Sequence, residues 1–237
     1  MLKLDKQIWN VDDISDFNNY LYNLRREDKI EWTKNIINTN KNVLAIESKD
    51  LRLVSKEIKK GNYVSFLDNY DFKYHEGMII YSYLISSIKD FKIQTRYINK
   101  LSKHIDNWAV VDSLKYSLKN NLSDYISYAY KLSTSKKTFE RRIAVRILFS
   151  FIPYDEYHND IFQIINSLYN EKEYYVNMAI SWLLCEMFIK KRYSVVNFLE
   201  HNKLNKEVSL KFVSKCHDSF RISNDDKLML NIYKVKE

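Results

Sequence analysis

Residues 139–149 read FERRIAVRILF, an apolar stripe interrupted by one small residue, Ala144. Apolar side chains three and four positions apart predict a helix with one buried face. The pattern recurs in three other segments, each with its own small residue: 74–85 with Gly77, 108–118 with Ser113 and 176–187 with Ala179. The four small residues are spaced 36, 31 and 35 positions apart, which is room for two helices per period.

Glycine and proline are almost absent from the chain, which has 237 residues with two Gly and one Pro. Average usage would give roughly 28 such residues. Phosphate-binding loops and nucleophile elbows need several glycines at fixed spacing, so Rossmann enzymes, P-loop NTPases and nucleophile-elbow hydrolases are excluded. The repeat spacing instead predicts an all-α, HEAT-like helical repeat α-solenoid with a concave, basic groove.

Helical periodicity extends over nearly the whole chain, and no shift of composition marks a linker. We expect one repeat domain over residues 1–237, with divergent N-terminal helices in 1–40 and the repeat core in 41–237. The predicted helices cover an N-terminal set within 12–38 and then 48–60, 62–70, 74–89, 92–104, 107–119, 122–133, 138–152, 157–170, 174–191, 193–200, 206–216 and 224–234.

Basic side chains are in excess, with 38 Lys and Arg against 30 Asp and Glu and a net charge of +8. They gather on the 48–60 helix, which carries Arg52 and Lys56, and at the start of the 138–152 helix. Any one cluster is explained by a solvated face. Several of them on a basic solenoid favour nucleic acid as the partner.

Neither a metal nor a cofactor is expected. The two cysteines, Cys185 and Cys216, fit no ligand spacing, and we interpret them as buried thiols. The start, MLKLDKQIWN, lacks the apolar core of a signal peptide, and no apolar run is long enough to span a membrane. We therefore expect a cytoplasmic monomer.

Three stretches carry a family resemblance: IDNWAVVDS at 105–113, FERRIA at 139–144 and AISW at 179–182. Together they resemble the AlkD-type DNA alkylation repair glycosylases, over roughly residues 30–223. The resemblance implies a HEAT-like repeat protein that acts on double-stranded DNA, alkylated or otherwise damaged. It also implies monofunctional removal of cationic N3- and N7-alkylated purines, with the base left largely in the duplex.

Trp108 and Asp112 are four residues apart on a predicted helix, so their side chains leave one face about one turn apart. We expect Asp106 or Asn107 to cap this helix. An alkylated purine already carries positive charge, so its departure needs no general acid. The deoxyribose becomes oxocarbenium-like as the base departs, and a carboxylate such as Asp112 could stabilise that charge.

Aromatic faces attract cations, which is the role that the resemblance gives to Trp108 and Trp182. Arg142 matches the family's phosphate-binding arginine, and Arg141 and Arg146 add positive charge.

Structural interpretations stay open beside these roles. Trp182 could be a core residue, Asp112 a solvated polar group, and the paired arginines a means of stabilising stacked helices. Trp9 and Trp32 match no motif and are interpreted as packing residues. Four further polar residues are second-tier candidates, interpreted first as caps or as groups that stabilise the repeats: Asp106, Glu140, Glu76 and His75.

The chain departs from the family pattern near residue 45. Ala45 and Lys49 stand where the family often has glycine and proline, whereas Arg52 is retained. Residues 1–28 match no family pattern. Three functions follow as alternatives: an alkylpurine DNA glycosylase, a non-catalytic repeat protein that binds damaged or branched DNA, and a scaffold for another protein.

Overall fold

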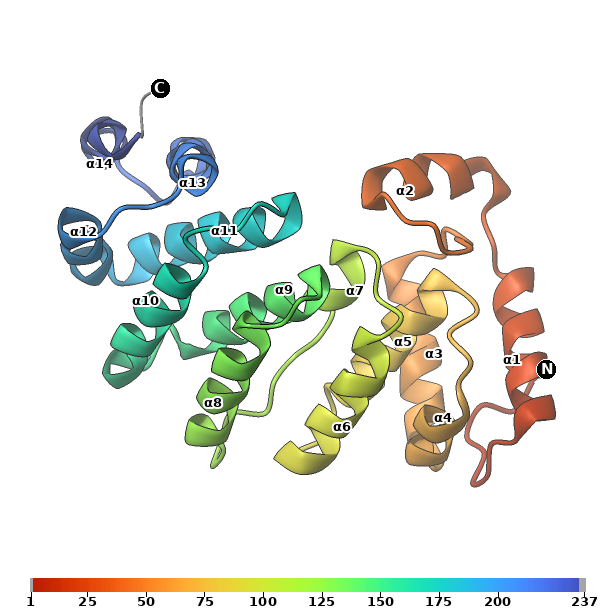
Figure 1. Ribbon diagram of the computed structural model, residues 1–237. Coiled ribbons are helices and arrows are strands. Elements are labelled where there is room, and N and C mark those ends of the chain that lie inside the picture. The colour runs from red at the N-terminus through yellow and green to blue at the C-terminus, as the bar shows by residue number, and fades with distance from the viewer. Residues whose placement is uncertain (1, 235–237) are drawn as a thin grey trace. The chain divides into compact units, whose positions relative to one another are not determined.

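The computed structural model describes residues 2–234, and this part of the chain is all-α, as predicted (Figure 1). It contains fourteen α-helices and four short 3₁₀ turns, without a β-strand. The chain divides into two compact units, Met1–Ser117 and Leu118–Glu237. Across residues 2–234, no helix combines the length and apolar composition needed to cross a membrane.

The first unit is built around α5, which packs against α3, α4, α6 and α7. Because α5 is enclosed by helices, it is apolar on nearly all sides. Gly77 on α5 has a packing reason, since a Cβ there would lie 1.6 Å from the Tyr70 hydroxyl oxygen. The seven helices of this unit are α1 (Val11–Asn23), α2 (Ile30–Ile37), α3 (Ser48–Lys60), α4 (Tyr63–Asn69), α5 (His75–Ile85), α6 (Phe91–Ser102) and α7 (Trp108–Asp112).

An aromatic cluster attaches the N-terminal segment to this unit. The Trp9 ring lies 5.9 Å from that of Phe17 and 5.0 Å from that of Phe66, both edge-on. Trp9 is 1% exposed, so its interpretation as a packing residue is confirmed. The same interpretation was wrong for Trp32, which is 64% exposed on α2. Helical periodicity does not distinguish a buried stripe from an apolar face left to solvent.

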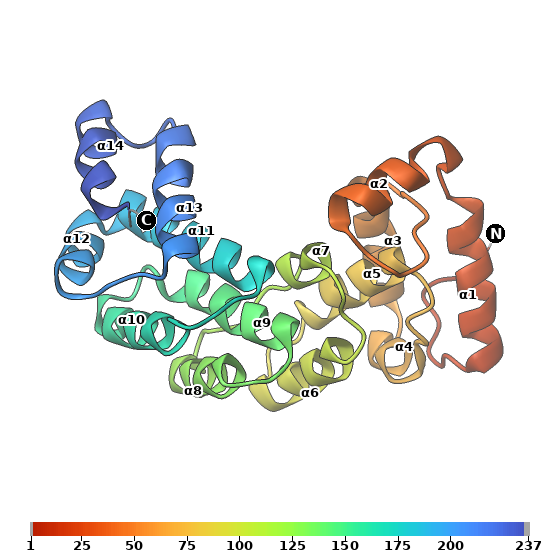
Figure 2. The same ribbon diagram turned by 45° about the horizontal axis from the view of Figure 1, so that its top comes forward.

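The second unit follows the repeat pattern. Helix α11 packs against both α9 and α13, and α8 and α12 pack against α9 and α11 respectively (Figures 1 and 2). Ala144 on α9 and Ala179 on α11 are fully buried, as small residues between closely packed helices should be. The helices of this unit are α8 (Leu122–Ser133), α9 (Thr138–Leu148), α10 (His158–Ser167), α11 (Tyr174–Lys190), α12 (Arg192–His201), α13 (Lys206–Asp218) and α14 (Asn224–Leu230).

One predicted helix is much shorter than expected. The periodicity predicts a helix over 107–119, but α7 ends at Asp112. Side chains from the preceding helical hairpin bind the backbone that follows. The Ser86 hydroxyl accepts the Lys115 N–H at 2.9 Å, and the Gln94 amide donates to the Lys115 carbonyl at 3.3 Å. These bonds replace the helical ones, and the chain continues without regular structure.

Candidate functional site

A hollow of about 420 Å³ in the first unit is lined by residues of α2, α3, α5 and α7. Two of the predicted catalytic residues, Trp108 and Asp112, line it, and so does the predicted DNA-binding residue Arg52. Tyr83 and Lys115 also line the hollow, and sequence reasoning identified neither of them. Lys115 was missed because it lies in the stretch that was predicted to be helical.

Asn107 sets the start of α7. Its side-chain oxygen accepts the N–H groups of Ala109 at 3.1 Å and Val110 at 3.4 Å, so of the two expected caps Asn107 is the one used. Trp108 and Asp112 follow as the first and last residues of α7, one turn apart. Both are half-buried. The hollow therefore has an aromatic ring and a carboxylate on the same short helix.

The Trp108 side chain also packs against a small apolar cluster made of Ile37, Val43 and Ala45. This cluster joins α2 to the segment that precedes α3. Trp108 is thus held from the N-terminal side of the unit, and the position of its ring depends on the conformation of residues 38–46.

The buried Glu76 carboxylate fixes the conformation of residues 38–46. It is 2% exposed and accepts the N–H groups of Leu44 at 3.0 Å and Ala45 at 2.7 Å. Burial raises the pKa of Glu76, while these backbone hydrogen bonds oppose the shift. Ala45 has a φ of 57°, in the left-handed region that favours glycine. Ala45 thus stands where the family pattern has glycine, and its backbone conformation is one that glycine adopts without strain.

Asp106 holds the other end of the same segment. Its two carboxylate oxygens accept the Thr39 hydroxyl at 2.7 and 2.8 Å, and one also accepts the Asn40 N–H at 2.9 Å. The Asn107 amide donates to Asp106 at 2.9 Å and lies 3.3 Å from Nδ1 of His75. Burial lowers the pKa of His75 to about 4, although Asp106 acts in the opposite direction.

Asp106 and Glu76 thus order the segment beside Trp108, and Glu76 and His75 also line the hollow.

Helix α3 carries exposed cations on one face. Arg52 and Lys56 are both exposed and one turn apart, and the Arg52 guanidinium carbon lies 5.8 Å from the centre of the Tyr83 ring. Arg52 therefore places positive charge at the hollow that also contains the Asp112 carboxylate.

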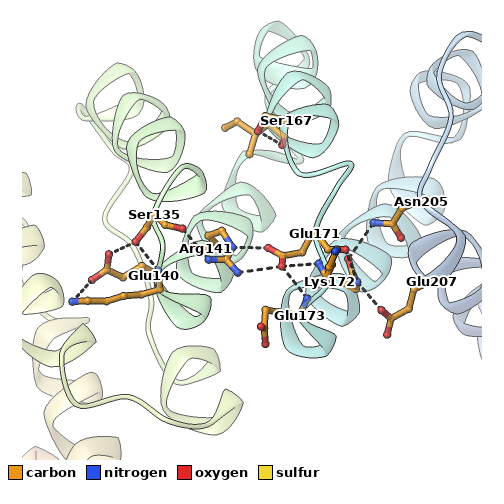
Figure 3. A network of polar contacts seen from close by, with 12 residues as sticks. Ser135, Glu140, Arg141, Ser167, Glu171, Lys172, Glu173, Asn205 and Glu207 are labelled. Carbon is orange, nitrogen blue, oxygen red and sulfur yellow. Dashed lines mark hydrogen bonds and ion pairs between the residues drawn. The ribbon is translucent and has the colours of Figure 1, made fainter.

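In the second unit, Arg141 is engaged with Glu171 in the loop before α11 (Figure 3). Its Nε and Nη2 donate to the two carboxylate oxygens at 2.5 and 3.1 Å, and its Nη1 donates to the Ser135 carbonyl at 2.8 Å. Burial acts to raise the pKa of Glu171, but Arg141 and nearby backbone N–H groups bring it below the usual range. Arg141 thus joins one helical repeat to the next.

The start of α9 is tied to the same network. Glu140 accepts the Ser135 hydroxyl at 2.7 Å and lies 3.2 Å from the Lys137 ammonium (Figure 3). Glu140 is accordingly a group that stabilises the helix start, as interpreted from the sequence.

Arg142 is 5% exposed, and its Nη1 donates to the Tyr175 carbonyl. Arg146, one turn later, packs against two aromatic rings that also contact each other, with their centres 4.9 Å apart. Its guanidinium carbon is 4.2 Å from the centre of the Phe149 ring and 4.6 Å from that of Trp182. Trp182 is therefore not a simple core residue, because it is half-buried and has a cation stacked against it.

The predicted site residues thus form two groups. Trp108, Asp112 and Arg52 share one hollow in the first unit. Arg146 and Trp182 contact each other in the second unit, and Arg141 and Arg142 lie on the same helix as Arg146. Within residues 2–234, His, Cys, Asp and Glu side chains form no group of three or more that could hold a metal ion.

A comparison with protein families gives a match over most of the chain. The family described as "DNA alkylation repair enzyme" matches residues 17–215, from within α1 to within α13. The match begins before residue 30, where the resemblance was expected to begin, and includes α2. No curated protein matches the chain.

Proposed function

The chain belongs to the DNA alkylation repair enzyme family, and we propose that within this family it acts as a DNA glycosylase on cationic N3- and N7-alkylated purines in double-stranded DNA. Family membership gives DNA repair as its role and DNA as its partner. The proposal adds the reaction, which is hydrolysis of the bond between the damaged base and its deoxyribose.

One observation carries the proposal: Trp108 and Asp112, one turn apart on α7, line the same hollow together with Arg52. A sugar bound in this hollow would contact the Trp108 ring and the Asp112 carboxylate, and Arg52 could bind the neighbouring phosphate. The ordered segment 38–46 holds the Trp108 ring in place through Glu76 and Asp106.

The chemistry needs stabilisation of the sugar rather than of the base. A purine alkylated at N3 or N7 departs as a neutral molecule, and the electron pair of the glycosidic bond leaves with it. Positive charge then develops on the deoxyribose. A carboxylate about 4 Å away stabilises that charge by about 4 kcal/mol at an effective dielectric constant of about 20. This corresponds to roughly a thousandfold in rate, and we assign it to Asp112.

Trp108 contributes its aromatic face, which attracts the same developing charge. The phosphates are bound by Arg52 and Lys56 on α3. In the second unit we assign the phosphate contacts to the α9 arginines Arg141 and Arg146 rather than to Arg142, which is 5% exposed and donates to the Tyr175 carbonyl.

The test is a base-release assay on methylated duplex DNA with the parent protein and Asp112→Asn. We expect the parent to release 7-methylguanine or 3-methyladenine. Asp112→Asn removes the charge and keeps the shape, so the rate should fall about a thousandfold while DNA affinity persists. Asp124→Asn, which alters an exposed carboxylate on α8, is the matched control and should release bases as the parent does. A parent that releases no alkylated base would refute the proposal.

A second candidate function is DNA binding without base release. The observation that favours it is the Arg146 guanidinium 4.6 Å from the centre of the Trp182 ring, where it occupies a face that a cationic base or sugar would approach. In that case the parent would bind duplex DNA with strong salt dependence, and alkylated bases would stay attached.

A further inference from the structure

The two cysteines of the chain, Cys185 and Cys216, face each other where α11 packs against α13. The Ser181 hydroxyl, one turn before Cys185, donates to the Val208 carbonyl at 3.1 Å, so this side of α11 is turned towards α13. Further along the same interface, the Cys216 thiol donates a hydrogen bond to the Cys185 sulfur. Two sulfurs in such contact need only small side-chain rotations to reach an S–S bond length of about 2.05 Å.

The two thiols differ in their access to solvent. Cys185 is 4% exposed and lines a hollow of about 510 Å³, together with Trp182, Lys215 and Arg221. Cys216 is fully buried and lies outside the lining of this hollow. A small molecule that enters the hollow therefore reaches Cys185 first.

The surroundings of Cys185 favour its thiolate. The hydrogen bond from Cys216 lowers the pKa of the Cys185 thiol, and Arg221 and Lys215 act in the same direction, against burial and the Glu186 carboxylate. Donation of that hydrogen bond and burial raise the pKa of Cys216. Because the thiolate is the nucleophilic form, these contacts make Cys185 the attacking sulfur and keep Cys216 as a thiol beside it.

We propose that Cys185 is a site of oxidation by hydrogen peroxide, with Cys216 as the resolving thiol, and that the resulting disulfide joins α11 to α13. Neither thiol takes part in the proposed base release, so the two proposals stand or fall separately. The disulfide would close a loop of chain that contains the whole of α12, and it would lie one turn from Trp182 on α11. Thiol–disulfide exchange with a dithiol would reverse it.

Oxidation proceeds in two steps. The Cys185 thiolate attacks one oxygen of the peroxide, the O–O bond breaks, and the departing hydroxide takes up the proton that Cys185 has lost. Cys185 is then a sulfenic acid. The Cys216 sulfur attacks the Cys185 sulfur, the S–O bond breaks, and the hydroxide leaves as water with the Cys216 proton. The two thiols are oxidised to one disulfide, and the peroxide is reduced to water.

The experiment treats the reduced, full-length protein with hydrogen peroxide, blocks the remaining thiols with iodoacetamide and maps the peptides by mass spectrometry without reduction. We expect a cross-linked pair of peptides that contain Cys185 and Cys216, and an intact mass lower by two hydrogens. The protein should migrate as a monomer on a non-reducing gel, which shows that the disulfide lies within one molecule. Dithiothreitol should restore both thiols.

Three variants separate the roles of the two sulfurs. Cys216→Ser should stop at the Cys185 sulfenic acid, which dimedone traps as a stable adduct. Cys185→Ser should take up at least about tenfold less dimedone, because its remaining thiol is buried and keeps its proton. Ser214→Ala, which alters an exposed residue of α13, is the matched control and should form the disulfide as the parent does. Circular dichroism establishes that each variant is folded.

Three outcomes would overturn the inference: a parent whose two thiols survive peroxide, a disulfide found only between molecules, or equal dimedone labelling of Cys185→Ser and Cys216→Ser. The peptide map of the parent needs no substitution, so a variant that fails to fold does not protect the proposal. The base-release assay uses reduced protein and methylated DNA, and its failure would refute the glycosylase proposal alone.

Discussion

The Glu76 carboxylate accepts the backbone N–H of Ala45 at 2.7 Å, and Ala45 has the left-handed φ of 57°. The two residues are 31 positions apart in the chain. Left-handed backbone costs an L-residue about 1–2 kcal/mol. The hydrogen bond to Glu76 offsets part of that cost, so Ala45 remains in this conformation without the glycine that would adopt it freely.

Replacing Ala45 by glycine should therefore stabilise the protein. Ala45→Gly removes the Cβ that is strained at positive φ, and we expect the free energy of unfolding to rise by about 1 kcal/mol. Chemical denaturation followed by circular dichroism measures the change. The matched control is Ala129→Gly in the interior of α8, which should instead destabilise the protein by about 1 kcal/mol. A lower stability for Ala45→Gly would contradict the strain assigned to this residue.

Stability should fall on mild acidification because of His75. Its pKa is about 4 in the folded protein, against 6.5 for an ordinary histidine. Between these values the unfolded chain binds a proton that the folded chain lacks. The free energy of unfolding is therefore undiminished above pH ~6.5 and decreases as the pH falls towards ~4. The loss amounts to roughly 3 kcal/mol.

Denaturation curves measured at several pH values test this dependence. His75→Gln should flatten the loss of stability over that range, whereas His201→Asn, at an exposed histidine, should leave it as in the parent. Equal slopes for His75→Gln and the parent would argue against a buried neutral His75.

Arg141 should matter for folding as well as for DNA. Its ion pair with Glu171 is largely buried, with side chains 15% and 5% exposed. Breaking such a pair costs about 3 kcal/mol, because one charge stays buried without its partner. We expect Arg141→Ala and Glu171→Gln both to lower the unfolding free energy by about this amount.

DNA affinity then separates the two roles of Arg141, since Glu171→Gln keeps the cation and Arg141→Ala removes it. If only Arg141→Ala weakens DNA binding, Arg141 contacts a phosphate. Equal affinities for the two variants would restrict Arg141 to the join between repeats.

The exposed cations of α3 should set the salt dependence of DNA binding. Each phosphate contact contributes about 0.9 to the slope of log affinity against log salt concentration. Arg52→Ala and Lys56→Ala should each reduce that slope by about one. Lys60→Ala is the matched control on α3, because the Lys60 ammonium is already 2.7 Å from Glu57. Fluorescence anisotropy at several salt concentrations gives the slopes, and an unchanged slope for Arg52→Ala would remove it from the interface.

Helix positions were predictable where the hydrophobic pattern is decided by local packing. The expected helices at 48–60 and 122–133 match α3 and α8 to the residue. The 107–119 helix was wrong because Ser86 and Gln94, more than twenty residues away in the chain, bind the backbone after α7. Periodicity records which residues are apolar, and it contains no information about side chains that compete for the backbone from a distance.

The candidate site was predictable to a similar degree. Helical spacing placed Trp108 and Asp112 on one face, and both line the hollow. Lys115 was missed because its position follows from the end of α7, and the bond between Arg141 and Glu171 was missed because a sequence does not show which loop faces which helix. The exposed Trp32 was misread for the same reason.

The carboxylates of Glu76 and Asp106 tie the backbone N–H groups of Asn40, Leu44 and Ala45 to α5 and to the turn before α7, which come later in the chain. These amide hydrogens are held by no partner in their own segment, so their exchange with solvent reports on the integrity of α5 and of the turn before α7. During synthesis this segment emerges first, and its partners follow at residue 76 for Leu44 and Ala45 and at residue 106 for Asn40. The segment 38–46 beside Trp108 therefore reaches its final conformation only after Glu76 and Asp106 have been synthesised.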